Sequence, residues 1–223
     1  MVLKPYSFSK LSTYKSCPRK FYYSYIIKAP KEEKDMTALL KGRAVHSILE
    51  VFPKKSSHKL ADKYQIEVDK FINSDLGKTY LLPNRISEYR FGIDSNLEPC
   101  SYNDKSCLFR GIIDCIVIID NRLYLVDYKT GKLKEPRWQE YDQLMFYSIY
   151  FFQKYNKIEH IDISYLYVEH DSENKITLER KYLDRYVSDL TKIINELEFD
   201  SSFDKNKTKL CDWCEYKEYC DLN

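Results

Sequence analysis

The stretch that decides the fold is residues 109–132, FRGIIDCIVIIDNRLYLVDYKTGK. Its first half is rich in β-branched residues, and the Asp120-Asn121 dipeptide that follows is suited to a tight hairpin turn. We therefore expect an antiparallel hairpin with strands over 109–119 and 123–128.

The second strand ends with an acid and a base on alternate residues. Because side chains alternate faces along a strand, Asp127 and Lys129 project from the same side, about 6.6 Å apart, and Tyr128 faces the other way. Across the hairpin Asp114 is embedded in an apolar run, where an unpaired carboxylate would be costly. Two carboxylates on neighbouring strands need a shared cation, and ligation by oxygen favours Mg²⁺ or Mn²⁺. The alternative is a surface ion pair between Asp127 and Lys129, which would contribute little.

The rest of the chain has helical or alternating apolar patterns. Helices are expected over 9–27 (N-capped by Ser9 or Ser12 and broken at Cys17-Pro18), 36–52, 61–76, 139–155 and 183–197, and further strands over 88–92, 161–168 and 176–181. A central hairpin flanked by helices predicts an α/β sheet sandwich.

Length and composition are those of a single folded domain of 223 residues, with 43% hydrophobic and 31% charged residues. No apolar stretch approaches the ~18 residues of a membrane span, and the start has no apolar leader. We expect a soluble, intracellular, cytoplasmic protein without a membrane partner. The net charge is only +2, but residues 1–34 carry eight Lys or Arg against two Glu, which suits a phosphate backbone as well as a solvated helix face.

The seven cysteines are an odd number, which argues against a disulfide framework. Cys115 lies in an apolar run and is expected to be a small buried hydrophobe. Cys211, Cys214 and Cys220 crowd the end of the chain, and Cys17 stands near its start. Four thiolates suffice for one tetrahedral zinc ion or one cluster, and either would bring the two ends of the chain together.

Taken in order, these motifs resemble those of the PD-(D/E)XK nucleases, in particular the RecB/AddB-type branch that includes the iron-sulfur exonucleases associated with CRISPR adaptation. The matching stretches are SFSKLSTYKSCPRKFYYSY (7–25), GRAVHSILE (42–50), GIIDCIVI (111–118), VDYKTG (126–131), QLMFYSIYF (143–151) and the closing cysteines. Each motif alone is weak, whereas six in the right order are specific.

The resemblance implies a restriction-endonuclease-like mixed sheet flanked by helices and a set of site residues. His46, Asp114, Asp127 and the main-chain carbonyl of Tyr128 would bind Mg²⁺ or Mn²⁺, and Lys129 would sit beside the attacking water, so that it need not pair with Asp127. An acidic residue near the site would be Glu88, with Glu98 as the alternative. Contacts with DNA would come from Gln143, Tyr147, Arg19 and Lys20.

The resemblance further implies a 4Fe-4S cluster on Cys17, Cys211, Cys214 and Cys220, with Zn²⁺ as the alternative. Residues 1–34 and 198–223 would then form a cluster subdomain around a catalytic core of 36–197, within a single nuclease domain over 1–223.

The function expected is that of a metal-dependent DNA exonuclease, with or without endonuclease activity. It would hydrolyse phosphodiester bonds in single-stranded DNA or at DNA ends, during recombination, repair or CRISPR-type DNA processing, alone or with a protein partner. The alternative is a non-catalytic DNA-binding or scaffold subunit of a larger complex, stabilised by zinc or a cluster. RNA processing is a further alternative.

Overall fold

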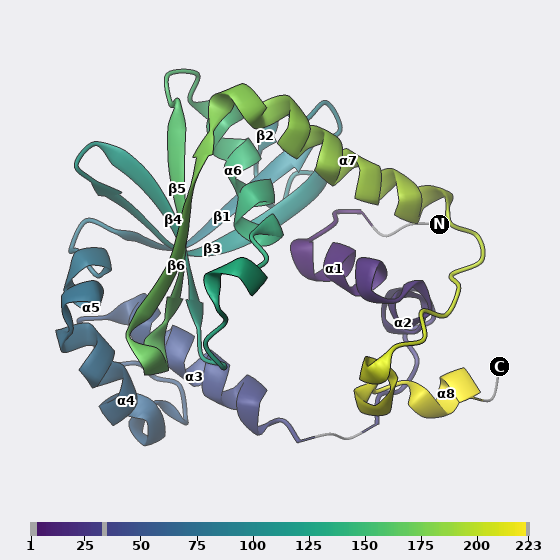
Figure 1. Cartoon of the computed structure of the whole chain (residues 1–223), viewed down its shortest axis with the longest axis horizontal. Helices are drawn as coiled ribbons and strands as arrows, with labels where there is room; N and C mark the ends of the chain where they lie inside the picture. Colours follow the sequence, from purple (N-terminus) through teal and green to yellow (C-terminus); the bar gives the residue numbers. More distant parts are fainter. Residues whose placement is uncertain (1–3, 33–34, 222–223) are drawn as a thin grey trace. The chain divides into compact units, whose positions relative to one another are not determined.

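The predicted hairpin forms the middle of the sheet. In a computed structural model, which describes residues 4–32 and 35–221, β3 (Cys107–Ile119) pairs antiparallel with β4 (Arg122–Lys129) (Figure 1). Asp120 and Asn121 have φ angles of 49° and 60°, as the two central residues of a type I′ turn require. The hairpin prediction is confirmed.

The sheet has six strands in the order β2-β1-β3-β4-β5-β6. The further strands are β1 (Ile86–Asp94), β2 (Pro99–Cys100), β5 (His160–Tyr167) and β6 (Ser172–Glu179). Strand β5 runs parallel to β4 and antiparallel to β6. A parallel pair needs a crossover, which α6 (Asp142–Lys154) supplies between β4 and β5. The result is a mixed α/β sheet flanked by helices, as expected.

One face of this sheet is covered by α3 (Thr37–Val51) and α4 (Ala61–Asn73). Their buried residues pack on side chains of β3, β4 and β5, among them Cys115, which is 0% exposed, and Tyr128, which is 3% exposed. The alternation along β5 sends Tyr165 to the opposite face, where α6 packs. The end of β4 therefore presents a different residue to each helical layer.

The remaining helices depart from the predicted ones at their ends. The first helix is α1 (Phe8–Ser16), capped by Ser7 rather than by Ser9 or Ser12, and it breaks before Pro18 as predicted. Ser74 caps α5 (Asp75–Tyr80) and so divides the predicted helix 61–76. The other segments are α2 (Pro18–Phe21), a π-helix (Tyr22–Ile26), α7 (Leu183–Phe199), α8 (Lys217–Asp221), and 3-10 turns at Pro136–Trp138, Val168–His170, Arg180–Tyr182 and Lys209–Trp213.

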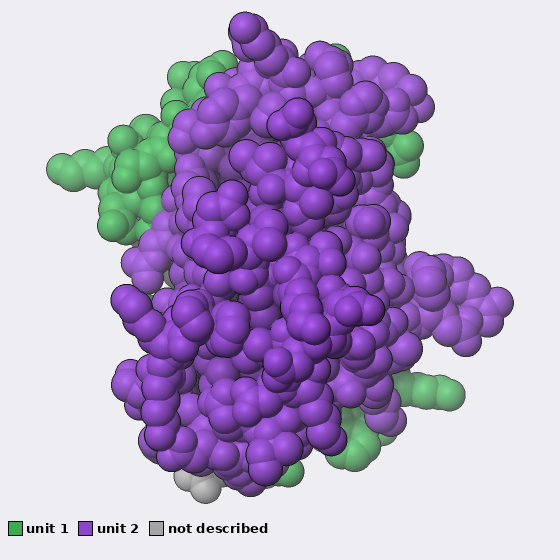
Figure 2. Space-filling model, turned by 90° about the vertical axis from the view of Figure 1, so that its left-hand side faces the viewer, with its two compact units in different colours: residues 1–35, 92–111, 184–223 green, residues 36–91, 112–183 purple. Residues whose placement is uncertain are grey.

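The chain divides into two compact units, coloured separately in Figure 2. Unit 1 comprises residues 1–35, 92–111 and 184–223, and unit 2 comprises 36–91 and 112–183. Both chain ends belong to unit 1, together with a middle segment that the sequence did not assign to them. Among the described helices, none combines the length and apolar character needed to cross a membrane.

Candidate functional site

The backbone of Tyr128 lies at the centre of the candidate site in unit 2. The last paired residues of the hairpin here are Cys115 and Val126, and beyond them the N–H of Tyr128 donates to Oδ2 of Asp114 at 2.8 Å. Its carbonyl oxygen lies 2.9 Å from Nε2 of His46. Both backbone polar groups of Tyr128 therefore contact residues that the sequence assigned to the site.

His46 reaches the strand because α3 approaches it closely one turn earlier. A Cβ at Gly42 would lie 3.3 Å from Oγ1 of Thr130, so a larger residue would require the Thr130 side chain to shift. Nδ1 of His46 lies 3.3 Å from Oδ1 of Asp114. Burial alone would lower the pKa of His46, but the hydrogen bond and charge of Asp114, with smaller contributions from Asp127 and the Tyr128 carbonyl, raise it to about 9. The imidazole is thus cationic at neutral pH and donates from both nitrogens.

Asp127 and Lys129 form an ion pair in the structure. Nζ of Lys129 lies 2.6 Å from Oδ2 of Asp127, whose side chain is only 9% exposed. Burial and the nearby charge of Asp114 raise the pKa of Asp127 to about 6, against the lowering effect of Lys129. The pair is therefore not the surface ion pair of the alternative interpretation, because Asp127 is buried, and it is a contact that the resemblance did not require.

Tyr165 lies beside this pair, and the sequence did not predict it as a site residue. It is the register partner of Asp127 on β5, is 1% exposed, and its ring centre lies 4.6 Å from Nζ of Lys129. A cation over an aromatic face is attracted to it, more so where water is excluded. No local pattern shows this contact, since the register between β4 and β5 is set across a long crossover.

Glu88 is brought to the site from β1 in an unusual backbone conformation. Its φ is 51°, in the left-handed region that is unfavourable for a residue with a side chain. Burial, followed by the charges of Asp114 and Glu50, raises the pKa of Glu88. Glu98 is exposed and lies in the turn after β1, where its N–H donates to Asp94. The structure thus places Glu88, not Glu98, beside Asp114.

Glu50 is the second residue that the sequence interpretation missed. It follows His46 by four residues on α3, so the two share a helix face. Its charge acts on Glu88. The four-residue spacing was a usable signal, but one exposed Glu on a helix is too common to single out.

The donor set at Tyr128 has the composition of a site for a hard divalent cation. It offers two carboxylates, an imidazole and a carbonyl oxygen, and the close carboxylates raise the pKa of Asp127, a repulsion that a cation would relieve. Over residues 4–32 and 35–221, however, no three His, Cys, Asp or Glu side chains are arranged around one metal position. In their present rotamers His46 pairs with Asp114, and Asp127 with Lys129.

Gln143 and Tyr147 lie on α6, four residues apart. Tyr147 is 6% exposed and its ring packs edge-on against Phe91, with centroids 5.0 Å apart. Gln143 is half-buried. Burial gives Tyr147 a packing role, and DNA contact by either residue stays a prediction.

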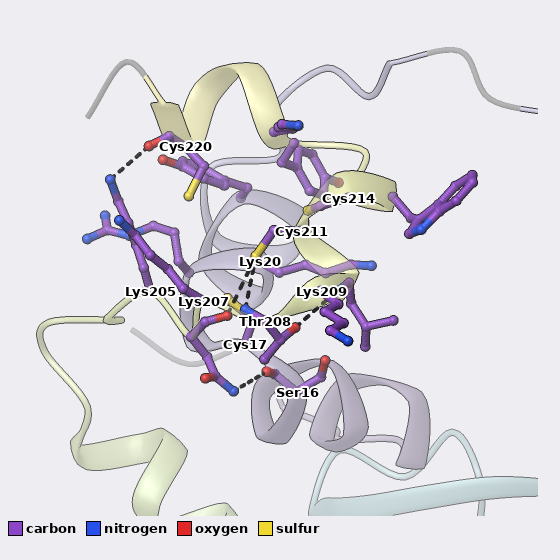
Figure 3. Close-up of a pocket in the computed structure, with 17 residues that line it drawn as sticks. Ser16, Cys17, Lys20, Lys205, Lys207, Thr208, Lys209, Cys211, Cys214 and Cys220 are labelled. Atoms are coloured by element: carbon purple, nitrogen blue, oxygen red, sulfur yellow. Dashed lines mark hydrogen bonds between the residues drawn. The ribbon is translucent and has the colours of Figure 1, made fainter.

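The cysteine residues near the two chain ends line one pocket in unit 1. This cavity of about 770 Å³ is bordered by Cys17, Cys211, Cys214 and Cys220, and by basic residues that include Arg19 and Lys20 (Figure 3). Hydrogen bonds join the two ends here: Asn206 donates to the carbonyl of Ser16 at 2.9 Å, and the Tyr23 hydroxyl donates to that of Tyr219 at 3.1 Å. Lys20 is itself paired with Glu215 at 3.0 Å.

Comparison with known proteins shows to which family the chain belongs. A stretch of 133 residues, 57% of this chain, is 29% identical to an ATP-dependent helicase/nuclease subunit from Streptococcus suis (strain 98HAH33), and the match spans 10% of the length of that protein. The crystal structure of SSO0001 aligns over the whole chain and 88% of its own length, with a TM-score of 0.47 and 15% identity. The model of the PD-(D/E)XK nuclease superfamily matches residues 5–221. The chain belongs to the PD-(D/E)XK nuclease superfamily.

Proposed function

We propose that this protein is a Mg²⁺- or Mn²⁺-dependent deoxyribonuclease that acts as an exonuclease on single-stranded DNA or DNA ends. The observation that carries the proposal is the cluster at the end of β4, where Asp114, Asp127, His46 and the Tyr128 carbonyl meet beside the Lys129 ammonium. Family membership supports a nuclease. The name of the Streptococcus suis relative, a helicase/nuclease subunit, supports nuclease action alongside a helicase. Recombination, repair and CRISPR-type DNA processing are the processes we propose for this protein.

In the proposed hydrolysis, a divalent cation and side chains of the protein would have separate roles. A divalent cation held by His46, Asp114, Asp127 and the Tyr128 carbonyl would offset phosphate charge and acidify a bound water. Lys129 is the group suited to the charge that develops on the phosphate, because its side chain is 34% exposed while its Nζ is held from beneath by Tyr165 and from the side by Asp127. Glu88 adds a further carboxylate able to orient the water.

We also propose that the four pocket cysteines bind a 4Fe-4S cluster. They offer four thiols around one cavity, in which the two chain ends already contact each other. Zinc is the competing ion on chemistry alone. Absorption in the visible region of anaerobically purified protein, with iron and zinc analysis of the same sample, separates the two.

The cluster is expected to stabilise the chain ends rather than the hydrolytic centre. Cys214→Ser should remove the visible absorption and increase protease cleavage within residues 205–221, while Mn²⁺ binding at the His46 site persists. Cys100→Ser is the control, since Cys100 does not line the pocket. Visible absorption unchanged in Cys214→Ser would contradict the assignment.

The decisive assay for the nuclease follows end-labelled single-stranded and duplex DNA with Mg²⁺ or Mn²⁺. Lys129→Ala should lower kcat about 100-fold or more, in line with loss of one group that stabilises the transition state. Lys70→Ala, which removes an exposed lysine on α4, is the matched control.

Circular single-stranded DNA then distinguishes the modes of cleavage. An exonuclease leaves the circle intact, whereas cutting of the circle assigns an endonuclease. If linear DNA is bound but never cut with either metal, the alternative of a non-catalytic DNA-binding subunit is correct.

A further inference from the structure

The loop between the catalytic strand β4 and α6 carries an exposed aromatic side chain that packing does not explain. All residues from 131 to 138 are exposed, and Trp138, the last residue of a 3-10 turn, is 67% exposed. A large aromatic side chain gains most of its stabilisation from burial, so this ring contributes little to the fold.

Buried side chains nevertheless hold this loop in place. Oε1 of Gln139, the neighbour of Trp138, accepts from the Tyr167 hydroxyl at 2.6 Å and from Nδ2 of Asn174 at 3.4 Å. The same Nδ2 donates to the carbonyl of Lys134 at 2.9 Å. Tyr167 and Asn174 are 3% and 4% exposed. The backbone around Trp138 is thus anchored although its side chain is solvated.

The anchors belong to the strand residues next to the candidate catalytic groups. Tyr167 is the register partner of Lys129 on β5. Two residues beyond Gln139, the ring of Tyr141 lies 5.7 Å from that of Tyr165, which itself lies under the Lys129 ammonium. The loop is therefore fixed to the same two positions of β5 that flank Asp127 and Lys129.

An exposed, anchored indole beside a phosphodiesterase centre has a clear physical use. Aromatic side chains stack on unpaired bases, and this interaction tolerates any base sequence. The Arg137 guanidinium lies 5.5 Å from the centre of the Trp138 ring and pairs with Glu135 at 2.8 Å, so the net positive charge of the loop comes from the exposed Lys132 and Lys134. Paired bases in a duplex do not offer their faces to such a ring.

We propose that residues 132–138 form a binding site for single-stranded DNA, in which Trp138 stacks on an unpaired base close to the scissile phosphate. This inference rests on the proposed nuclease function and deepens it, because it makes the loop the determinant of preference for unpaired over paired DNA.

The test uses the fact that the chain has two tryptophans, Trp138 and Trp213. In a Trp213→Phe background Trp138 is the single indole, and its fluorescence is titrated with an oligothymidine in EDTA, where cleavage is blocked. We expect saturable quenching by the oligothymidine and little by a blunt duplex of equal length. Quenching that is equal for the two DNAs, or absent, overturns the proposal.

Affinity is then compared among variants by anisotropy of labelled oligothymidine. Trp138→Ala should weaken binding about 5- to 150-fold, the range expected from loss of one base-stacking contact, and Trp138→Phe should recover most of it. Trp213→Ala, which removes a ring that is 78% exposed in unit 1, should leave the affinity near that of the wild type. Equal weakening by both alanine variants overturns the specific assignment.

The binding readout keeps this inference separate from the nuclease proposal. If Trp138→Ala cleaves single-stranded DNA and binds it with the affinity and KM of the wild type, the loop site alone is overturned. If Trp138 fluorescence is quenched and Trp138→Ala binds more weakly, but neither the wild type nor any variant cleaves DNA with either metal, the loop site is supported and the nuclease proposal is overturned.

Discussion

Nζ of Lys129 lies 4.6 Å from the ring centre of Tyr165, a residue 36 positions further along the chain and 1% exposed. The ammonium thus contacts a buried ring and the Asp127 carboxylate, while the Lys129 side chain stays 34% exposed. Tyr165 is in this sense a positioning residue for the candidate catalytic lysine.

Replacement of Tyr165 by Leu should therefore lower kcat by about tenfold to thirtyfold, the equivalent of a well-desolvated cation–π contact. Tyr165→Phe keeps the aromatic face and should retain most of the activity. Steady-state kinetics on single-stranded DNA measure kcat for both variants, and thermal melts of the same samples show whether they are folded. In a Lys129→Ala background the Leu substitution should have no additional effect on kcat, and an undiminished effect there would assign it to packing alone.

Divalent metal binding should release a proton from His46. Its pKa of about 9 in the metal-free protein means that the imidazole is protonated at pH 7.5, and a ligand must be neutral. Calorimetric titration with Mn²⁺ in two buffers of different ionisation enthalpy should show release of about one proton per ion. His46→Gln should abolish the release, whereas His58→Gln, outside the site, should preserve it. Release that is independent of His46 would remove it from the ligand set.

The buried carboxylate of Asp127 should destabilise the metal-free protein at neutral pH. Because its pKa is about 6 when folded against an ordinary 3.8, its contribution to stability is fully present below about pH 3.8 and is lost as the pH rises through about 6. Asp127→Asn should therefore raise Tm in EDTA at pH 7.5, by about 2–4 °C for each kcal/mol gained, and the gain should vanish near pH 4. Asp62→Asn, on an 82% exposed side chain, is the control. A lower Tm for Asp127→Asn at pH 7.5 would show that the ion pair with Lys129 outweighs the burial.

Glu88 should show opposite effects on stability and activity. At a φ of 51° a glycine relieves backbone strain of about 1 kcal/mol, so Glu88→Gly should unfold at higher denaturant concentration. Loss of its carboxylate should at the same time lower kcat or Mn²⁺ affinity. Leu97→Gly, at a φ of 67° in the turn after β1, should gain stability without that loss. Wild-type kinetics in Glu88→Gly would exclude Glu88 from the site.

Local patterns were sufficient for the hairpin and for most helices, because turn chemistry and apolar periodicity act over a few residues. They placed Asp114 and Asp127 on adjacent strands and His46 on a helix. The contacts of the site depend on tertiary structure. They come from the β4–β5 register that puts Tyr165 next to Lys129, from the left-handed backbone conformation of Glu88, and from the rotamers that join Asp127 to Lys129. Even the N-cap of the first helix is Ser7 rather than the predicted Ser9 or Ser12, since each of these serines could accept a hydrogen bond from the helix N-terminus.

Tyr128 belongs to two parts of the molecule at once. Its side chain is packed among the apolar residues under α3 and α4, while its N–H and its carbonyl, which belong to successive peptide groups, contact Asp114 and His46. A repacking that shifts the backbone of Tyr128 therefore moves both contacts. Substitutions deep beneath α3, remote from DNA and metal alike, should for this reason change the turnover of the proposed nuclease while every reacting side chain is left in place.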